Sequence, residues 1–245
     1  MNNSTLSTDY TNAYVNYGKR LFEEFDGMCI QCILHDLPLE YCGLDIGACD
    51  GSFAEQIQQK RILQGKHEGG IICVDPYPTH TRVLAIDGEK YVMSCMEDTF
   101  DFVICKFMIH FIQDMELFLK NLKRILRPGG QVYVMTLNPT TSFPWSHSFQ
   151  TGFVRSCLDT VLFESWLDKE KWNWEKERFE STTKLDNENW QQWFIDLVRS
   201  KGFSNLYQYT DAEIEESIQF FMDLCRSKPQ DAYIYLDIRM YVLKL

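Results

Sequence analysis

The stretch LDIGACDGSF, Leu44 to Phe53, constrains the fold more than any other part of the sequence. A short apolar run ends there in two glycines, Gly47 and Gly51, and a helix-like segment follows directly. A strand, a glycine-rich turn and a helix in this order bring backbone N–H groups and a helix start up to a ligand. The stretch therefore predicts a ligand-binding turn in an α/β sheet.

Strand-like and helix-like segments alternate on both sides of this turn. Short apolar runs are typical of strands buried on both faces of a parallel sheet, and the sequence contains EYCGLDIG, GIICVDPYP, FDFVICKFMIHFI and QVYVMTLNP. Helices are expected at GSFAEQIQQKRILQ and at MELFLKNLKRIL, where Asp114 is a plausible N-cap. The alternation predicts a parallel α/β sheet.

Other segments give separate expectations. Residues 9–34 predict one or two helices, and the Asp-Gly pair within TRVLAIDGEKYVMS predicts a hairpin. Residues 140–189 are aromatic-rich and mixed in charge, which indicates an insertion without a clean strand. After it we expect, in order, helix NWQQWFIDLVRSKGF, strand SNLYQYTD, helix AEIEESIQFFMDLCRS and strand AYIYLDIRMYVLKL.

Composition excludes several classes of function. The formal net charge of −11 disfavours nucleic acid as a partner, because phosphate-backbone binders use clustered Lys and Arg. No apolar run approaches the roughly 18 residues that span a bilayer, and no leader-like start is visible, so we expect a cytoplasmic protein with no membrane partner. Nine cysteines scattered through apolar segments suit reduced thiols. CIQC with His35 has metal-like spacing but lacks a second pair, so packing is the favoured interpretation.

The turn at Gly47 does not match a dinucleotide site. That fingerprint needs G-x-G-x-x-G, and this sequence reads Gly47-Ala48-Cys49-Asp50-Gly51. The turn, Asp75 at the end of the next strand, DTFDFVICKFMIHFI and LKRILRPGGQVYVMTLNP together resemble a class I S-adenosylmethionine-dependent methyltransferase of the small-molecule type, with a methyltransferase type 11-like domain. The resemblance is close over residues 40–139 and looser over the last 55 or so.

The resemblance implies a fold, a division of the chain and a cofactor. The implied fold is Rossmann-like and doubly wound, with a mostly parallel seven-stranded sheet, helices on both faces and the aromatic-rich insertion after the fifth strand. A single domain over 1–245 would then comprise a helical lid (1–39), the cofactor-binding core (40–139), an acceptor cap (140–189) and the C-terminal part of the sheet (190–245). The implied cofactor is S-adenosyl-L-methionine.

Cofactor-binding roles are carried over to matching positions. Asp45 would orient the methionine ammonium, Asp75 would bind the ribose diol, and Lys106 and Phe107 would lie near the methionine end. Adenine would be bound by Asp87 or, if the hairpin forms, by Ser94 or Cys95. The full set of expected cofactor-binding residues is Tyr14, Asp45, Gly47, Ala48, Cys49, Gly51, Asp75, Pro76, Asp87, Ser94, Cys95, Lys106 and Phe107.

His110 is the candidate catalytic residue, because it follows the fourth strand, where an acceptor would approach the methyl group. A packed histidine is the equally open alternative. A D/N-P-P-Y run, typical of methylation at planar amide or adenine nitrogens, is absent, since CKFM stands there. Carboxylates arranged as in the metal site of catechol-type enzymes are not evident either, so no metal is expected.

The expected acceptor is a small molecule methylated on an O or N atom. A pocket roofed by the N-terminal helix and the insertion would use aromatic side chains, which suit flat, apolar or cationic acceptors. Its candidate residues are Tyr10, Tyr17, Phe143, Trp145, His147 and Phe149. The alternative is a protein-directed methyltransferase or a non-catalytic cofactor-binding protein whose Trp-rich insertion docks a partner.

Overall fold

The chain forms two compact units in a computed structural model that describes residues 8–65 and 69–245. The first unit comprises the described residues among 1–22, together with 137–158 and 178–238. The second comprises the described residues among 23–136, with 159–177 and 239–245.

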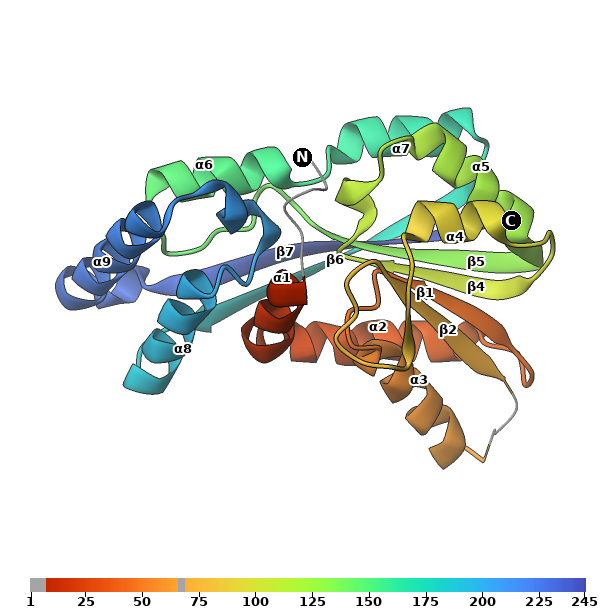
Figure 1. Cartoon of the computed structure of the whole chain (residues 1–245), viewed down its shortest axis with the longest axis horizontal. Helices are drawn as coiled ribbons and strands as arrows, with labels where there is room; N and C mark the ends of the chain where they lie inside the picture. The colour runs from red at the N-terminus through yellow and green to blue at the C-terminus, as the bar shows by residue number, and fades with distance from the viewer. Residues whose placement is uncertain (1–7, 66–68) are drawn as a thin grey trace. The chain divides into compact units, whose positions relative to one another are not determined.

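One seven-stranded sheet runs in the order β3-β2-β1-β4-β5-β7-β6 (Figure 1). The strands are β1 (Cys42–Ile46), β2 (Gly70–Asp75), β3 (Val83–Ala85), β4 (Phe100–Lys106), β5 (Leu126–Leu137), β6 (Asn173–Lys184) and β7 (Tyr233–Lys244). The pairs β1–β2, β1–β4, β2–β3 and β4–β5 are all parallel. The predicted Rossmann-like, mostly parallel seven-stranded sheet is confirmed.

Helices cover both faces of the strands in the second unit. They are α2 (Glu23–Asp36), α3 (Ser52–Leu63), α4 (Gly88–Ser94), α5 (Met115–Ile125) and α7 (Thr160–Lys169), with a 3₁₀ turn η4 (Ile109–Phe111). In Figure 1, α2 and α3 lie on one side of β1, β2 and β4, and α4 and α5 lie on the other. The core of this unit runs through β4, where residues 102–105 are almost completely buried.

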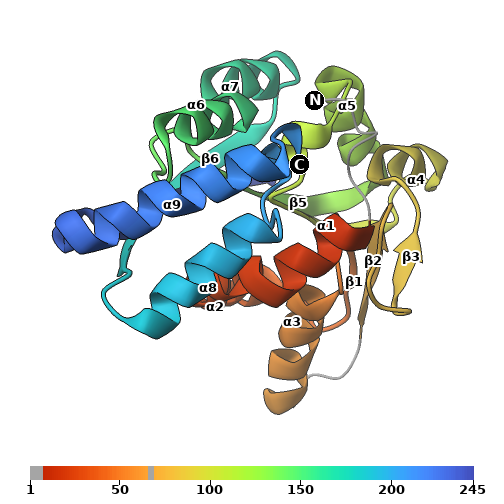
Figure 2. The ribbon, with the colours of Figure 1, turned by 60° about the vertical axis from the view of Figure 1, so that its left-hand side comes forward.

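The first unit is mostly helical. It contains α1 (Thr8–Ala13), η2 (Tyr14–Gly18), η3 (Lys19–Phe22), α6 (His147–Ser156), α8 (Glu188–Arg199), η5 (Ser204–Gln208), α9 (Asp211–Ser227) and η6 (Pro229–Asp231). Helix α8 packs against α9 and against η2, which continues α1 (Figure 2). Within the described parts of the chain, no helix is both long enough and apolar enough to cross a membrane.

Local capping explains where several helices begin. Asp114 accepts from the backbone N–H of Leu117 at 2.9 Å, which starts α5 where the sequence predicted it. A capping box between Thr210 and Glu213 starts α9. The helices expected over 9–34 are also present, as α1, η2, η3 and α2.

The hairpin predicted at Asp87 and Gly88 is wrong, because this pair begins α4. Asp87 caps the helix by accepting from the backbone N–H of Lys90 at 3.1 Å. A Cβ on Gly88 would lie 2.3 Å from Cγ2 of Ile46, so glycine lets the helix start pack directly against β1. In this Asp-Gly pair, Asp87 is therefore the N-cap of α4 and Gly88 packs closely against Ile46, and the pair does not form a hairpin turn.

Two further expectations of secondary structure are wrong. The insertion 140–189 does contain a strand, β6, which is last in the sheet order and mostly exposed. Its charged sequence suits an edge strand and hides the alternation that would have revealed it. The strand expected at SNLYQYTD is instead the 3₁₀ turn η5, because the cap at Thr210 makes the chain turn into α9.

Candidate functional site

The turn between β1 and α3 has a fixed left-handed shape. Gly47, Cys49 and Gly51 have φ angles of 75°, 54° and 75°. A side chain on Gly47 would also place its Cβ 2.7 Å from Cβ of Met108. Both the left-handed φ angle and this close contact therefore require glycine at position 47. Cys49 adopts the left-handed conformation despite its side chain, which is a local strain concentrated at this turn.

Backbone hydrogen bonds fix the turn against β2. The N–H groups of Gly47 and Ala48 both donate to the carbonyl of Val74, at 2.8 and 3.1 Å. Gly51 donates to the carbonyl of Ala48 at 2.8 Å and so closes the turn before α3. The glycine-rich segment and the end of β2 are therefore one structural unit.

Asp75 ends β2 and completes this arrangement. Its Oδ2 accepts from the N–H of Cys49 at 3.1 Å, and its Oδ1 accepts from the N–H of Tyr77 at 2.8 Å. Pro76 is the intervening residue and is exposed. Burial raises the pKa of Asp75, while the two N–H donors oppose that shift. Each oxygen of the carboxylate still has a lone pair for a further donor, such as a diol hydroxyl.

Asp45 is a buried carboxylate on β1, two residues before Gly47. In the sheet register, Asp45 lies beside Cys73 of β2 and Ile104 of β4. Because alternate residues of a strand share a face, Asp75 and Lys106 point to the same face as Asp45. Burial raises the pKa of Asp45 to about 7, and the Lys106 ammonium opposes this shift. The carboxyl ends of three adjacent strands thus bring two carboxylates and one ammonium to one face.

Lys106 forms an ion pair that sequence reasoning missed. Its Nζ lies 2.6 Å from Oδ2 of Asp26 on α2, and both side chains are close to nine-tenths buried. The ammonium also lies 4.6 Å from the ring centroid of Phe53. Asp26 is preceded by Glu23 and Glu24 in the sequence, so nothing in the pattern distinguished the one buried acid from its exposed neighbours.

Phe107 turns the chain after β4. Its φ of 53° is left-handed, and its N–H donates to the carbonyl of Met135 at 2.8 Å. The Phe107 ring contacts that of Phe25, with centroids 5.9 Å apart. Helix α2 therefore contacts the end of β4 at two neighbouring positions. The Phe25 ring packs on Phe107, and Asp26 forms an ion pair with Lys106.

The two alternatives for adenine lie at opposite ends of α4. Ile86 donates to the carbonyl of Asp75 at 3.2 Å, which places Asp87, the next residue, beside the end of β2. Ser94 and Cys95 are at the other end, where the carbonyl of Cys95 accepts from Nη1 of Arg124 at 2.6 Å. Arg124 lies two residues before β5, so this end of α4 lies near the amino ends of the parallel strands. This position favours Asp87 as the candidate, and roles for Ser94 and Cys95 in binding adenine stay predictions.

His110 lies in η4, four residues after β4. The side chain is half-buried, and its ring centroid is 4.0 Å from that of Phe111. Burial lowers the pKa of His110 to about 4, so the imidazole is neutral at physiological pH. A neutral ring can accept a proton, although a low pKa makes it a weak base. Both the catalytic and the packing roles stay open.

The N-terminal tyrosines belong to the first unit. Tyr14 and Tyr17 lie in the π-helix η2, and Tyr14 packs against Phe22 with ring centroids 6.4 Å apart. The carbonyl of Tyr17 accepts from Nε1 of Trp193 at 3.0 Å, which joins this segment to α8. Tyr10 lies in α1, but its side chain is outside the described part of the structure. Roles for these residues in binding stay predictions.

The aromatic residues expected to line the acceptor pocket are packed together in the first unit. Phe143, Trp145 and Phe149 are all buried. Phe143 and Trp145 have ring centroids 4.4 Å apart, and Phe149 stacks on Tyr209 at 4.1 Å. His147 is exposed at the first position of α6. The rings thus hold the unit together, and their contact with an acceptor stays a prediction.

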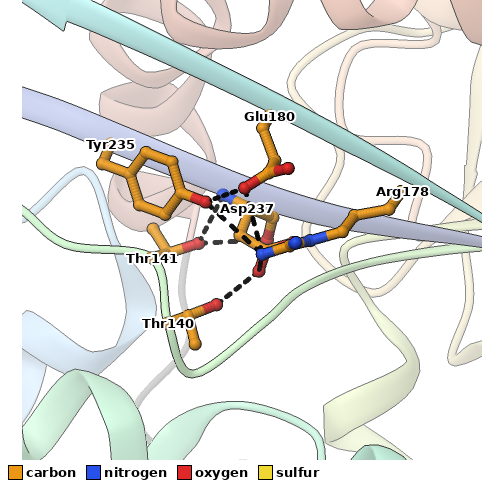
Figure 3. A network of polar contacts seen from close by, with 6 residues as sticks. All are labelled: Thr140, Thr141, Arg178, Glu180, Tyr235 and Asp237. Atoms are coloured by element: carbon orange, nitrogen blue, oxygen red, sulfur yellow. Dashed lines mark hydrogen bonds and ion pairs between the residues drawn. The ribbon is translucent and has the colours of Figure 1, made fainter.

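A second polar network, also missed from sequence, lies within the first unit (Figure 3). Asp237 is fully buried and receives a bidentate ion pair from Arg178, with Nε–Oδ1 and Nη2–Oδ2 distances of 3.0 and 2.7 Å. The hydroxyl of Thr140 also donates to the Asp237 carboxylate. The backbone N–H of Asp237 donates to Oγ1 of Thr141 at 3.0 Å. This network fixes the segment after β5 to β7 and β6.

Several solved structures of similar fold are described as methyltransferases. A putative methyltransferase from an antibiotic biosynthesis pathway of Anabaena variabilis is 16% identical, with a TM-score of 0.66 over 89% of this chain and 97% of that one. An S-adenosylmethionine-dependent methyltransferase from Archaeoglobus fulgidus is 14% identical, with a TM-score of 0.53 over 94% and 100%. Phosphoethanolamine N-methyltransferase 2 of Haemonchus contortus is 14% identical, with a TM-score of 0.51 over 89% and 51%. These likenesses establish the fold.

The sequence itself matches a family model. The model describes a methyltransferase domain, and it matches residues 19–205, which include the whole of the turn, Asp75 and the end of β4. A comparison with curated proteins found no match. On the family match and the fold, this chain belongs to the class I S-adenosylmethionine-dependent methyltransferases.

Proposed function

We propose that the protein binds S-adenosylmethionine at the carboxyl ends of β1, β2 and β4 and transfers the methyl group to an O or N atom of a small molecule. The observation that carries the proposal is the joint placement of Asp45, the Gly47 turn and Asp75. Ligands of open α/β sheets lie beyond the carboxyl ends of the strands, where these three features meet.

The residues present fit this cofactor. Asp75 accepts from two backbone N–H groups and retains acceptor capacity for the two ribose hydroxyls. Asp45 offers a carboxylate to the methionine ammonium. The role of accepting from the adenine amino group is assigned to Asp87, because it lies at the start of α4 and beside the end of β2. The roles proposed for Gly47 to Gly51 are backbone contacts, since the turn has little side-chain bulk.

When bound, the cofactor supplies a methyl group already activated on a sulfonium. The protein therefore contributes mainly alignment of the acceptor and exclusion of water. We propose that His110 takes the proton that an acceptor hydroxyl or ammonium loses, because its ring is neutral at pH 7 and follows the strand that ends at the cofactor site.

A small acceptor is favoured over a protein. The methyltransferase of Haemonchus contortus is named for phosphoethanolamine, and that of Anabaena variabilis for an antibiotic pathway, so small acceptors occur among proteins of this fold. The aromatic residues of α6 and the segment before it are buried, which leaves few exposed rings there to dock a protein partner.

The proposed compartment is the cytoplasm. All nine cysteines are free thiols, and burial raises the pKa of Cys73 to about 12, which keeps that thiol protonated. Thiols used as small apolar core residues suit a reducing environment.

The test is methyl transfer by the purified protein. It should be incubated with methyl-labelled S-adenosylmethionine and either a metabolite extract or a protein extract. We expect label in the metabolite fraction and binding of S-adenosylhomocysteine by calorimetry. Label only in protein would establish the protein-directed alternative, binding without transfer would establish a non-catalytic role, and no binding would refute the proposal.

A further inference from the structure

We propose that Asp26 and Lys106 are positioning residues that set the charge of Asp45, so that helix α2 tunes cofactor affinity. The inference rests on the proposed cofactor site, because Asp45 is the residue assigned there to the methionine ammonium. Neither partner of the ion pair needs to touch the cofactor for this effect.

The ion pair between Lys106 and Asp26 is buried and flanked by aromatic rings. The Nζ of Lys106 is 2.6 Å from Oδ2 of Asp26, and the side chains are only 11% and 8% exposed. The ammonium lies above the rings of Phe53 and Phe107, at 4.6 and 5.6 Å from their centroids. Poor hydration makes the pair less screened than a surface salt bridge, and so its charges act on neighbouring groups.

Asp45 is a buried carboxyl group on the same face of the sheet as Lys106. It lies on β1 beside Ile104 of β4, and Lys106 is two residues further along the same face. Three carboxylates act on Asp45 and favour its neutral form: Asp75 at the end of β2, Asp50 in the turn and Asp26 on α2. Lys106 acts in the opposite direction and favours the charged form.

The two members of the pair therefore have opposite effects on one carboxyl group. The pKa of Asp45 is about 7, so small changes in this balance alter its charge at physiological pH. Removing Lys106 should leave Asp45 neutral at pH 7, and a neutral acid binds an ammonium weakly. Removing Asp26 should leave the Lys106 charge uncompensated and hold Asp45 ionised to lower pH.

The experiment measures the charge of Asp45 in two ways in the full-length protein. Carboxyl ¹³C NMR follows the titration of Asp45 without cofactor, with Asp45→Asn to assign the signal. Calorimetry follows the affinity for S-adenosylhomocysteine between pH 6 and 8.5. The variants are Lys106→Met, Asp26→Asn and Lys106→Arg, and Lys120→Met is the matched control, because Lys120 pairs with Glu116 on the exposed face of α5.

We expect opposite displacements of the midpoint. In Lys106→Met it should rise by about one pH unit or more, and in Asp26→Asn it should fall. Lys106→Arg should restore the wild-type midpoint, and Lys120→Met should leave it unchanged. The affinity measured by calorimetry should decrease as the pH drops below the Asp45 midpoint of each variant. Lys106→Met should therefore bind weakly at pH 7 and more tightly toward pH 8.5.

Other outcomes overturn the inference. A merely structural ion pair would lower affinity at every pH in both variants and would leave the Asp45 midpoint in place. If Lys106→Met does not fold, Asp26→Asn decides alone, since an unchanged or raised midpoint contradicts the proposal. Wild-type protein that binds no S-adenosylhomocysteine at any pH would refute the proposed cofactor site instead.

Discussion

The carboxylate of Asp75 accepts a hydrogen bond from the backbone N–H of Cys49 at 3.1 Å, so the acid at the end of β2 also holds the turn after β1. The residue that we propose to bind the ribose is therefore also part of the scaffold that shapes the proposed cofactor site. The two roles of Asp75 have different requirements. The turn needs only a hydrogen-bond acceptor, whereas hydrogen bonds from the ribose diol are stronger to a charged acceptor than to a neutral one.

Asp75→Ala should weaken S-adenosylhomocysteine binding by roughly 1.5 to 3 kcal/mol, because a charged acceptor is lost. Asp75→Asn, which keeps one acceptor oxygen for the turn, should lose less. The matched control is Asp101→Asn, since Asp101 accepts from the backbone N–H of Cys42 at 2.6 Å but lies at the start of β4. Calorimetry checks the ranking, and equal losses in Asp75→Asn and Asp101→Asn would contradict the assignment.

Asp45→Asn should stabilise the cofactor-free protein at pH 8. The folded pKa of about 7 lies above the value of 3.8 for an unperturbed Asp, so the stability from this group is present at low pH and lost as pH rises through 7. The advantage of the variant should shrink by on the order of 2 kcal/mol between pH 8 and pH 5. Urea unfolding at both pH values measures it. The variant should also bind S-adenosylhomocysteine poorly, and a gain in stability that does not depend on pH would sink the idea.

Gly47→Ala should disrupt the turn more than Gly65→Ala does. Both glycines have left-handed φ angles, 75° and 74°, but a Cβ at 47 would lie 2.7 Å from Met108, and one at 65 would meet nothing within 4 Å. The backbone strain of about 1 to 2 kcal/mol is common to both. Thermal or urea unfolding should therefore show a larger loss for Gly47→Ala, with loss of cofactor binding in that variant only. Similar losses would show that the steric contact is unimportant.

His110→Gln should reduce turnover by roughly 100-fold or more if the imidazole is the proton acceptor. Affinity for S-adenosylhomocysteine should be nearly unchanged. Since the pKa of His110 is about 4, its contribution to the rate should stay constant from pH 8 down to about pH 5, whereas cofactor binding falls below pH 7 through Asp45. Steady-state kinetics at saturating cofactor separates the two groups. Unchanged turnover would assign His110 to packing against Phe111.

Hydrogen exchange tests the acceptor roof. Amides in residues 8–20 and 140–155 should exchange more slowly when S-adenosylhomocysteine and acceptor are both bound than with S-adenosylhomocysteine alone. If only the Gly47 turn and the Asp75 region are protected, the acceptor is held elsewhere.

Local signals in the sequence predicted the strands β1, β2, β4 and β5 and the helices α3 and α5. The strands that end at Ile46, Asp75 and Lys106 are nearly continuous apolar runs, which is the pattern of strands buried on both faces of a parallel sheet. The order of the turn, the acid and the following strands also indicated the family. Asp45, Gly47 and Asp75 could be named because each is fixed by its position next to a strand end.

Tertiary structure decided what the local pattern left open. The Asp-Gly pair at 87 became a helix start because Gly88 packs on Ile46, a contact between residues 42 positions apart. Strand β6 is held by its place at the sheet edge, and its charged sequence carries no burial pattern to reveal it. The pairing of Asp26 with Lys106 across 80 residues, and of Arg178 with Asp237 across 59, depends on desolvation inside the fold. The sequence shows which residues are charged, but only packing determines which charges are buried away from water. A buried charge is costly unless an opposite charge pairs with it.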